Sequence, residues 1–218
     1  MLLFKIINVT FQCLIKSFFE FKWAISLVIR EHYIEKKLGI DTAKTYSVQK
    51  EFSAYKDSED YAPTKYPELQ TMMDYLKLNK DDVFVDFGCG KGRVIFLAAI
   101  QKLKKVVGVE LNQALIDVTK KNLKNIKFNN TPIELFQGDA VNFDVKDGTV
   151  FYMFNPFGLK TFAKVLDNIK KSMSSNPRTI RILYKNSIFR SLLDETNWLE
   201  PQGHIDKTEI SVWRSKLN

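Results

Sequence analysis

The residues best suited to chemistry form an acid followed by three alternating glycines, Asp86-Phe87-Gly88-Cys89-Gly90-Lys91-Gly92. The apolar run 83–85 precedes the acid, and a helical pattern over 94–99 follows the last glycine. Glycine tolerates positive φ and has no Cβ, so a ligand can approach the main chain of such a turn. The following helix presents free N–H groups and its positive dipole end to a carboxylate or phosphate. The pattern predicts a buried strand, a turn and a helix that hold a nucleotide-like cofactor.

Three further apolar runs also end in residues that could contact a ligand. In open α/β sheets, ligands bind outside the carboxyl ends of the strands. A carboxylate in this position suits the two hydroxyls of a ribose. The three ends are Glu110, Gly138-Asp139-Ala140 and Asn155-Pro156-Phe157.

The glycine spacing separates two classes of cofactor. The fingerprint of nicotinamide-binding proteins is G-x-G-x-x-G after a strand. Here the order is Asp86-x-Gly88-x-Gly90-x-Gly92, which departs from that fingerprint. A nicotinamide-dependent oxidoreductase of doubly wound fold stays open as an alternative, and so does a non-catalytic cofactor-binding protein.

In this order, the four strand ends resemble the motifs of class I S-adenosylmethionine-dependent methyltransferases over residues 60–215. The resemblance implies S-adenosyl-L-methionine as the cofactor. It also implies an antiparallel hairpin at one edge of the sheet. The cofactor contacts that it implies are Asp86, Gly88, Gly90 and Gly92 for the methionine part, Glu110 for the ribose, and Asp139 and Ala140 for the adenine.

The fourth strand end, Asn155-Pro156-Phe157, is similar to the Asn/Asp-Pro-Pro-aromatic motif of amino-directed methyltransferases, with one proline instead of two. The amide oxygen of Asn155 and a main-chain carbonyl could accept N–H bonds, and Phe157 could stack on a ring or lie beside a cation. These three residues are the predicted catalytic loop. The predicted acceptor is a nitrogen of a protein lysine, a nucleobase or a small metabolite, and the alternative is that Asn-Pro only turns the chain.

The segment Tyr61-Ala62-Pro63-Thr64-Lys65-Tyr66 precedes a helical pattern. It resembles a group of poorly characterised bacterial methyltransferases, together with the glycine turn, Gly108-Val109-Glu110, Phe154-Asn155-Pro156-Phe157 and, in the amino-terminal arm, Ile40-Asp41-Thr42. That likeness implies that Thr64 and Tyr66 approach the cofactor or the substrate. The alternative is a plain helix start with a tyrosine packed on the sheet edge. Arg93, at the start of the next helix, could bind the cofactor carboxylate or form a surface salt bridge.

From residue 82 onward, apolar runs alternate with helical patterns, which predicts a Rossmann-like, doubly wound, mostly parallel sheet. Residues 205–214 alternate weakly and could form the antiparallel edge hairpin. The predicted strands lie near 82–87, 105–110, 132–137, 149–154 and 178–184, and the predicted helices near 67–78, 92–102, 112–126, 158–174 and 187–196.

Residues 1–60 are predicted to be a helical and irregular extension, and residues 61–218 the cofactor-binding domain. Residues 1–38 are strongly apolar, but their longest charge-free stretch, Ile6 to Ile15, is too short to span a bilayer, which takes about 20 residues. The segment could pack on the domain, join two copies of the chain, or lie on a membrane surface.

The formal net charge of +8 favours acidic partners such as an anionic membrane or a nucleic acid. No dense basic run marks a nucleic-acid site, and a lysine-rich solvated surface explains the charge equally well. Cys13 and Cys89 have no partners at metal-ligand or disulfide-framework spacing, so neither a metal nor a disulfide is predicted. This cysteine usage suits the cytoplasm. The methyl acceptor and the oligomeric state do not follow from the sequence.

Overall fold

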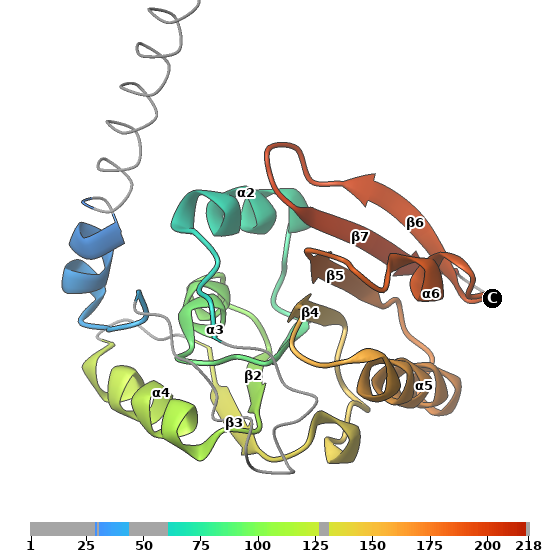
Figure 1. Ribbon diagram of the computed structural model, residues 1–218, viewed down its shortest axis with the longest axis horizontal. Coiled ribbons are helices and arrows are strands. Elements are labelled where there is room, and N and C mark those ends of the chain that lie inside the picture. Colours follow the sequence, from blue (N-terminus) through green and yellow to red (C-terminus); the bar gives the residue numbers. More distant parts are fainter. Residues whose placement is uncertain (1–28, 30, 44–60, 127–130, 217–218) are drawn as a thin grey trace, which may run out of the picture.

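The computed structural model describes residues 29, 31–43, 61–126 and 131–216 (Figure 1). Five strands pair in parallel, and a carboxyl-terminal hairpin extends the sheet in antiparallel fashion. The strand order is β3-β2-β1-β4-β5-β7-β6. The strands are β1 (Val83–Phe87), β2 (Lys105–Glu110), β3 (Ile133–Gln137), β4 (Val150–Phe154), β5 (Arg181–Lys185), β6 (Leu199–His204) and β7 (Ile210–Ser215).

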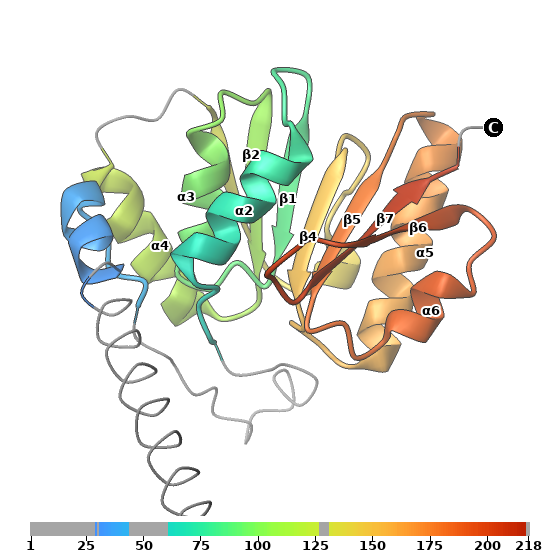
Figure 2. The same ribbon diagram turned by 90° about the horizontal axis from the view of Figure 1, so that it is seen from above.

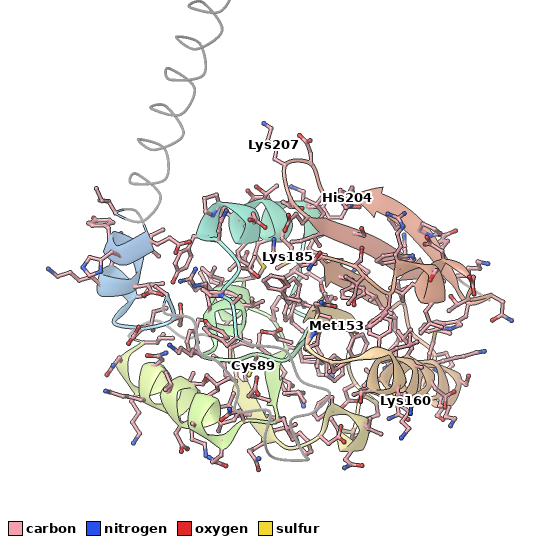
Figure 3. The ribbon with its side chains drawn as sticks, viewed as in Figure 1. Cys89, Met153, Lys160, Lys185, His204 and Lys207 are labelled. Atoms are coloured by element: carbon pink, nitrogen blue, oxygen red, sulfur yellow. The ribbon has the colours of Figure 1, made fainter. Side chains whose placement is uncertain are left out.

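Helices cover both faces of this sheet (Figure 2). The first three pack on one face and the last two on the other, and each face has its own apolar cluster. Met153 of β4 belongs to the cluster beneath α5 (Figure 3). The helices are α2 (Tyr66–Leu76), α3 (Arg93–Ala99), α4 (Gln113–Asn125), α5 (Leu159–Ser175) and α6 (Arg190–Asp194), with a short 3-10 helix at Ala140–Asn142.

The predicted Rossmann-like fold with its antiparallel edge hairpin is confirmed. The hairpin differs from the prediction in its extent, because β6 begins at Leu199 rather than near residue 205. Only the first residue of β6 is buried and the other five are exposed. A strand with no buried alternation gives no period-2 signal, which explains why the sequence pattern showed only β7.

Residues 31–38 are helical and lie beside α4 (Figure 1). The following turn is bonded to that helix, since the Asp41 N–H donates to Asn122 Oδ1 (3.0 Å) and Asn122 Nδ2 donates to the Asp41 carbonyl (3.2 Å). Within the described part of the chain, no helix is both long and apolar enough to cross a membrane. The predictions for residues 1–28 and 44–60, including membrane contact, lie outside the described residues.

Candidate functional site

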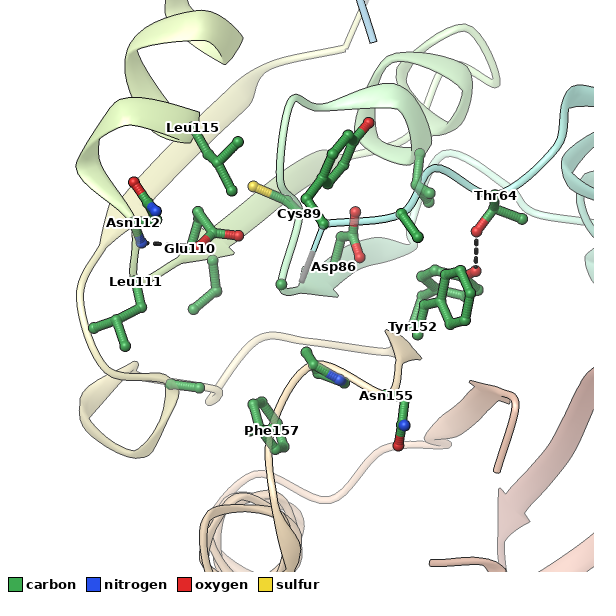
Figure 4. A pocket seen from close by; sticks show the side chains of 18 of the residues that line it. Thr64, Asp86, Cys89, Glu110, Leu111, Asn112, Leu115, Tyr152, Asn155 and Phe157 are labelled. Carbon is green, nitrogen blue, oxygen red and sulfur yellow. Dashed lines mark hydrogen bonds between the residues drawn. The ribbon is translucent and has the colours of Figure 1, made fainter. Parts of the chain in front are cut away.

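A cavity of about 270 Å³ lies outside the carboxyl ends of β1, β2 and β4 (Figure 4). Here the strand order reverses, with β2 on one side of β1 and β4 on the other. Residues 61–64 form one wall of this cavity, and the chain after β4 forms the opposite wall. The pocket therefore lies at the topological switch point, where open α/β sheets bind their ligands.

The glycine turn after β1 is held to β2 by main-chain bonds. The N–H groups of Gly88 and Cys89 both donate to the carbonyl of Val109, at 2.8 and 3.1 Å. A Cβ on Gly88 would come within 2.5 Å of Pro156 Cβ, and one on Gly90 within 2.2 Å of the Tyr61 ring. The glycines therefore let two neighbouring segments approach the turn closely.

Only one of the three predicted glycines lines the pocket. Gly88 does so, whereas Gly90 lies under the Tyr61 ring and Gly92 under Phe96. All three have positive φ, at 76°, 55° and 89°. Gly90 and Gly92 thus shape the turn, and a direct cofactor contact from either one stays a prediction.

Asp86 lies at the end of β1 between Gly108 of β2 and Tyr152 of β4, and its side chain lines the pocket. The residue is 2% exposed. Burial, and secondarily the carboxylate of Glu110, raise the pKa of Asp86 well above its usual range. Among the described residues, none donates a hydrogen bond to this carboxylate. A bound cation would therefore supply a charge partner for this buried carboxylate.

Glu110 ends β2 with both carboxylate oxygens oriented by the main chain. Oε2 accepts the Gly90 N–H (3.0 Å), and Oε1 accepts the Asn112 N–H (2.8 Å). Burial raises the pKa of Glu110, and these N–H bonds partly offset that effect. Each oxygen keeps further acceptor capacity for a ligand hydroxyl.

The predicted adenine end of the pocket combines apolar and polar groups. Leu111 and Leu115 line it together with Ala140 and Asp139. One carboxylate oxygen of Asp139 accepts the Val141 N–H (2.9 Å) and so caps the 3-10 helix. The second oxygen of Asp139 is left for a ligand N–H.

The predicted catalytic loop lies across the pocket from Asp86 (Figure 4). Asn155 adopts φ 46°, a left-handed conformation that asparagine tolerates better than most residues. Its Oδ1 accepts a hydrogen bond from the Tyr184 hydroxyl (2.8 Å). The ring of Phe157 meets Phe87 edge-on, with centroids 6.3 Å apart. Asn155, Pro156 and Phe157 all line the pocket, and their catalytic role stays a prediction.

Thr64 lines the pocket, and its Oγ1 lies 2.8 Å from the hydroxyl of Tyr152. Burial raises the pKa of Tyr152, so this phenol stays protonated. Tyr66, which was predicted to approach the ligand with Thr64, does not line the pocket. Its ring lies beneath the Arg93 guanidinium, 4.4 Å from centroid to carbon, with its hydroxyl 3.5 Å from Glu35.

Comparison with known proteins finds similar sequences over part of this chain. The sequence model of the histone methylation protein DOT1 family matches residues 42–149. A protein-lysine N-methyltransferase of Saccharolobus islandicus is 35% identical over 97 residues, which cover 43% of this chain and 58% of that protein. The H3 lysine-79-specific histone-lysine N-methyltransferase of Caenorhabditis elegans is 38% identical over 93 residues, which cover 39% of this chain and 10% of that protein.

Comparison with solved structures finds the same fold. The crystal structure of an RNA methyltransferase from Salinibacter ruber in complex with S-adenosyl-L-homocysteine superposes with a TM-score of 0.50. The two sequences are 21% identical, and the superposition covers 71% of this chain and 92% of the Salinibacter ruber chain. The DOT1 match, these relatives and the shared fold together support a class I S-adenosylmethionine-dependent methyltransferase family for this chain. The chain spans less than two thirds of the length of the curated relatives named above.

The residues that line the pocket fit S-adenosylmethionine. S-adenosylmethionine carries an ammonium group that could pair with the buried Asp86 carboxylate. Among the described residues, this carboxylate has no cationic partner. Its ribose has two hydroxyls, and Glu110 offers two oriented carboxylate oxygens. Its adenine ring is flat, and the side chains of Leu111 and Leu115 offer apolar surface to the faces of such a ring. The ammonium group, the ribose and the adenine ring therefore each have a suitable group in this pocket, at the edge of the sheet where such ligands bind.

The fold brings Arg93 into the site, where the sequence had left its role open, and it adds Glu35 and Tyr152, which had no signal of their own in the sequence. The surface alternative for Arg93 is wrong, because the residue is 2% exposed and lines the pocket. Its partner Glu35 stands 58 positions away along the chain. Tyr152 lies inside an unbroken apolar run, where an inward-facing hydroxyl looks like core. Sequence spacing could not have shown these contacts, because they form only when distant segments fold together.

Proposed function

We propose that this chain transfers the methyl group of S-adenosylmethionine to a nitrogen atom, and that the acceptor is a lysine side chain of a protein. The observation that carries the proposal is one pocket that joins Asp86 and Glu110 to the Asn155-Pro156-Phe157 loop. The first two residues suit the methyl donor. The loop is the part of the wall where an acceptor could approach the donor.

Bound S-adenosylmethionine supplies a methyl group on a positively charged sulfur. The lone pair of the acceptor nitrogen would form the new C–N bond as the C–S bond breaks, and the electron pair of the broken bond would stay on sulfur. The protein mainly has to align the nitrogen with the methyl carbon. The lysine amine must lose its proton before it attacks, because an ammonium group has no lone pair.

The Asn155 loop suits an amine acceptor. The Tyr184 hydroxyl uses one lone pair of Asn155 Oδ1, which leaves a second for an N–H of the substrate. The bond also fixes the rotamer of the side chain, so little ordering is needed when substrate arrives. Phe154 and Phe157, which also line the pocket, offer aromatic surface to the lysine stem or to its developing charge.

The relatives favour lysine over the other nitrogen acceptors. The matching family is that of a histone methylation protein, and the two relatives named above are a protein-lysine and a histone-lysine N-methyltransferase. A nucleobase and a small metabolite are the competing acceptors, and the test below separates them. A nicotinamide cofactor is not favoured, since the glycine spacing departs from its fingerprint.

Calorimetric titration with S-adenosylhomocysteine tests the cofactor. We expect saturable binding that Glu110→Gln weakens about tenfold or more, because a neutral amide loses the charge-assisted bonds to the ribose. Glu134→Gln is the matched control: it lies on the adjacent strand β3, and its exposed carboxylate pairs with Lys105. Binding of NAD without binding of S-adenosylhomocysteine would reverse the assignment.

Tritiated methyl transfer into a fractionated lysate tests the acceptor. We expect label in protein, and after acid hydrolysis it should coelute with methyllysine. Label in nucleic acid or in small molecules would reject lysine in favour of those acceptors. If cofactor binds but no fraction is labelled, the chain is a non-catalytic cofactor-binding protein.

A further inference from the structure

Arg93 and Glu35 form a buried charged cluster beside the cofactor pocket. We propose that they are positioning residues that hold one wall of that pocket, so that the helix at 31–38 forms part of the cofactor site. The proposal rests on the proposed function, because it takes S-adenosylmethionine as the ligand. It extends the functional unit to residues that precede the DOT1 match at 42–149.

Arg93 bonds to three separate segments through its guanidinium. Nη2 donates to Glu35 (3.0 Å), and Nη1 donates to Glu31 (3.2 Å). Nη1 also donates to the main-chain carbonyl of Thr64 (3.0 Å), and Nε donates to the Thr42 hydroxyl (2.7 Å). A guanidinium has five N–H donors in a rigid fork, so it can fix several segments at once.

Glu35 completes the cluster from the helix at 31–38. Its Oε1 accepts hydrogen bonds from both the main-chain N–H and the hydroxyl of Thr42, and the Arg93 side chain pairs with the same oxygen. The side chains of Glu35 and Arg93 are 8% and 2% exposed. Removing one charge of such a buried pair leaves the other uncompensated, so the geometry of the whole cluster depends on both.

The cluster acts on the pocket through residues 61–64. The Tyr61 hydroxyl donates to the carbonyl of Thr42 (2.8 Å), which places its ring over Gly90. The Thr64 carbonyl is held by Arg93, and the Thr64 hydroxyl lies 2.8 Å from that of Tyr152 inside the pocket. Tyr61 and Thr64 thus line the cavity in positions that depend on Thr42 and Arg93.

Substitutions with the same shape as the native residue test this role. We expect Glu35→Gln to weaken S-adenosylhomocysteine binding about tenfold in calorimetry, about 1.4 kcal/mol. We also expect faster deuterium uptake at residues 61–66. Thr42→Val removes only the hydroxyl that bonds to both Glu35 and Arg93, so it should also weaken binding and speed deuterium uptake. It provides a second test if Glu35→Gln does not fold.

A partly buried ion pair at the opposite, amino-terminal ends of the strands provides the control. Asp82 and Arg181 pair at 2.7 Å at the start of β1 and β5, away from the pocket. Asp82→Asn should lower the melting temperature and leave the dissociation constant for S-adenosylhomocysteine within twofold of the wild type. This contrast separates a positioning role from a general loss of stability.

The possible outcomes divide cleanly. Wild-type affinity in both Glu35→Gln and Thr42→Val would overturn the positioning role and leave the proposed function standing. An equal loss of affinity in Asp82→Asn would also overturn it, since stability alone would then explain the effect. If the wild-type chain itself binds no S-adenosylhomocysteine, the proposed function fails and this inference fails with it.

Discussion

At the scale of single residues, the strand ends carry most of what the sequence could reveal. Asp86, Glu110 and Asn155 each follow an apolar run, and parallel pairing brings such ends to one edge of the sheet. Their meeting at one pocket was therefore predictable from local pattern alone. The roles of Glu35 and Tyr152 were not predictable in this way. A glutamate in a helix and a tyrosine in a strand acquire a role only from their tertiary neighbours.

Asp86 should stabilise ligand binding and destabilise the free protein. Its raised pKa means that the folded state holds the proton more tightly than the unfolded state does, so its contribution to stability is lost as pH rises through the folded pKa. We therefore expect Asp86→Asn to raise the melting temperature of the free protein at pH 7 by about 2–4 °C per kcal/mol gained. The same variant should lose the melting shift that S-adenosylhomocysteine produces. A variant that is less stable than the wild type would contradict this view of Asp86.

The close approach of Tyr61 makes Gly90 intolerant of any side chain. A Cβ there would lie 2.2 Å from the ring, so Gly90→Ala should displace Tyr61 and cost about 1–3 kcal/mol of unfolding free energy, with a loss of cofactor affinity. Gly203→Ala is the control, because Gly203 also has positive φ (94°) but no atom within 4 Å of an added Cβ. Urea denaturation of both variants separates backbone strain from steric clash. An equal loss of unfolding free energy in the two variants would show that the contact between Gly90 and the Tyr61 ring does not contribute.

At the scale of elements, α2 and the edge hairpin are joined to β5 by one buried lysine. Lys185 ends β5 and pairs with Glu68 of α2 and with Glu209, which precedes β7 (Figure 3). Its ammonium group also lies 5.1 Å from the centroid of the Phe154 ring. The sequence predicted α2 and β5 but could not join them, since Glu68 and Lys185 stand 117 positions apart.

The two carboxylates around Lys185 should differ in their effect on stability. Glu68 is 16% exposed and Glu209 is 73% exposed, so solvent screens the second pair far more strongly. We expect Glu209→Gln to change the free energy of unfolding by at most about 1 kcal/mol, and Glu68→Gln to cost more than that. Chemical denaturation of the two single variants measures the difference. A larger loss in Glu209→Gln would show that exposure does not govern this cluster.

At the scale of the whole molecule, the pocket connects parts that the sequence suggested as separate. The helix at 31–38 belongs to the predicted extension of residues 1–60, yet it bonds to α3 through Arg93 and to α4 through the turn at Asp41. Ligand binding in the pocket should therefore also stabilise residues that do not line it. At a ligand concentration of about 100 times the dissociation constant, binding stabilises the folded state by about 2.7 kcal/mol.

We expect this stabilisation to be unevenly distributed over the chain. Deuterium uptake should fall on addition of S-adenosylhomocysteine at residues 61–66 and 86–93, and also at 31–42, which do not line the pocket. β6 lies at the far edge of the sheet from β1, so its uptake should change least. Protection of the pocket residues without protection of 31–42 would show that Arg93 does not transmit ligand binding to the amino-terminal helix. Protection of both would mean that cofactor affinity can be tuned from outside the pocket, through a helix that the motifs of the class do not include.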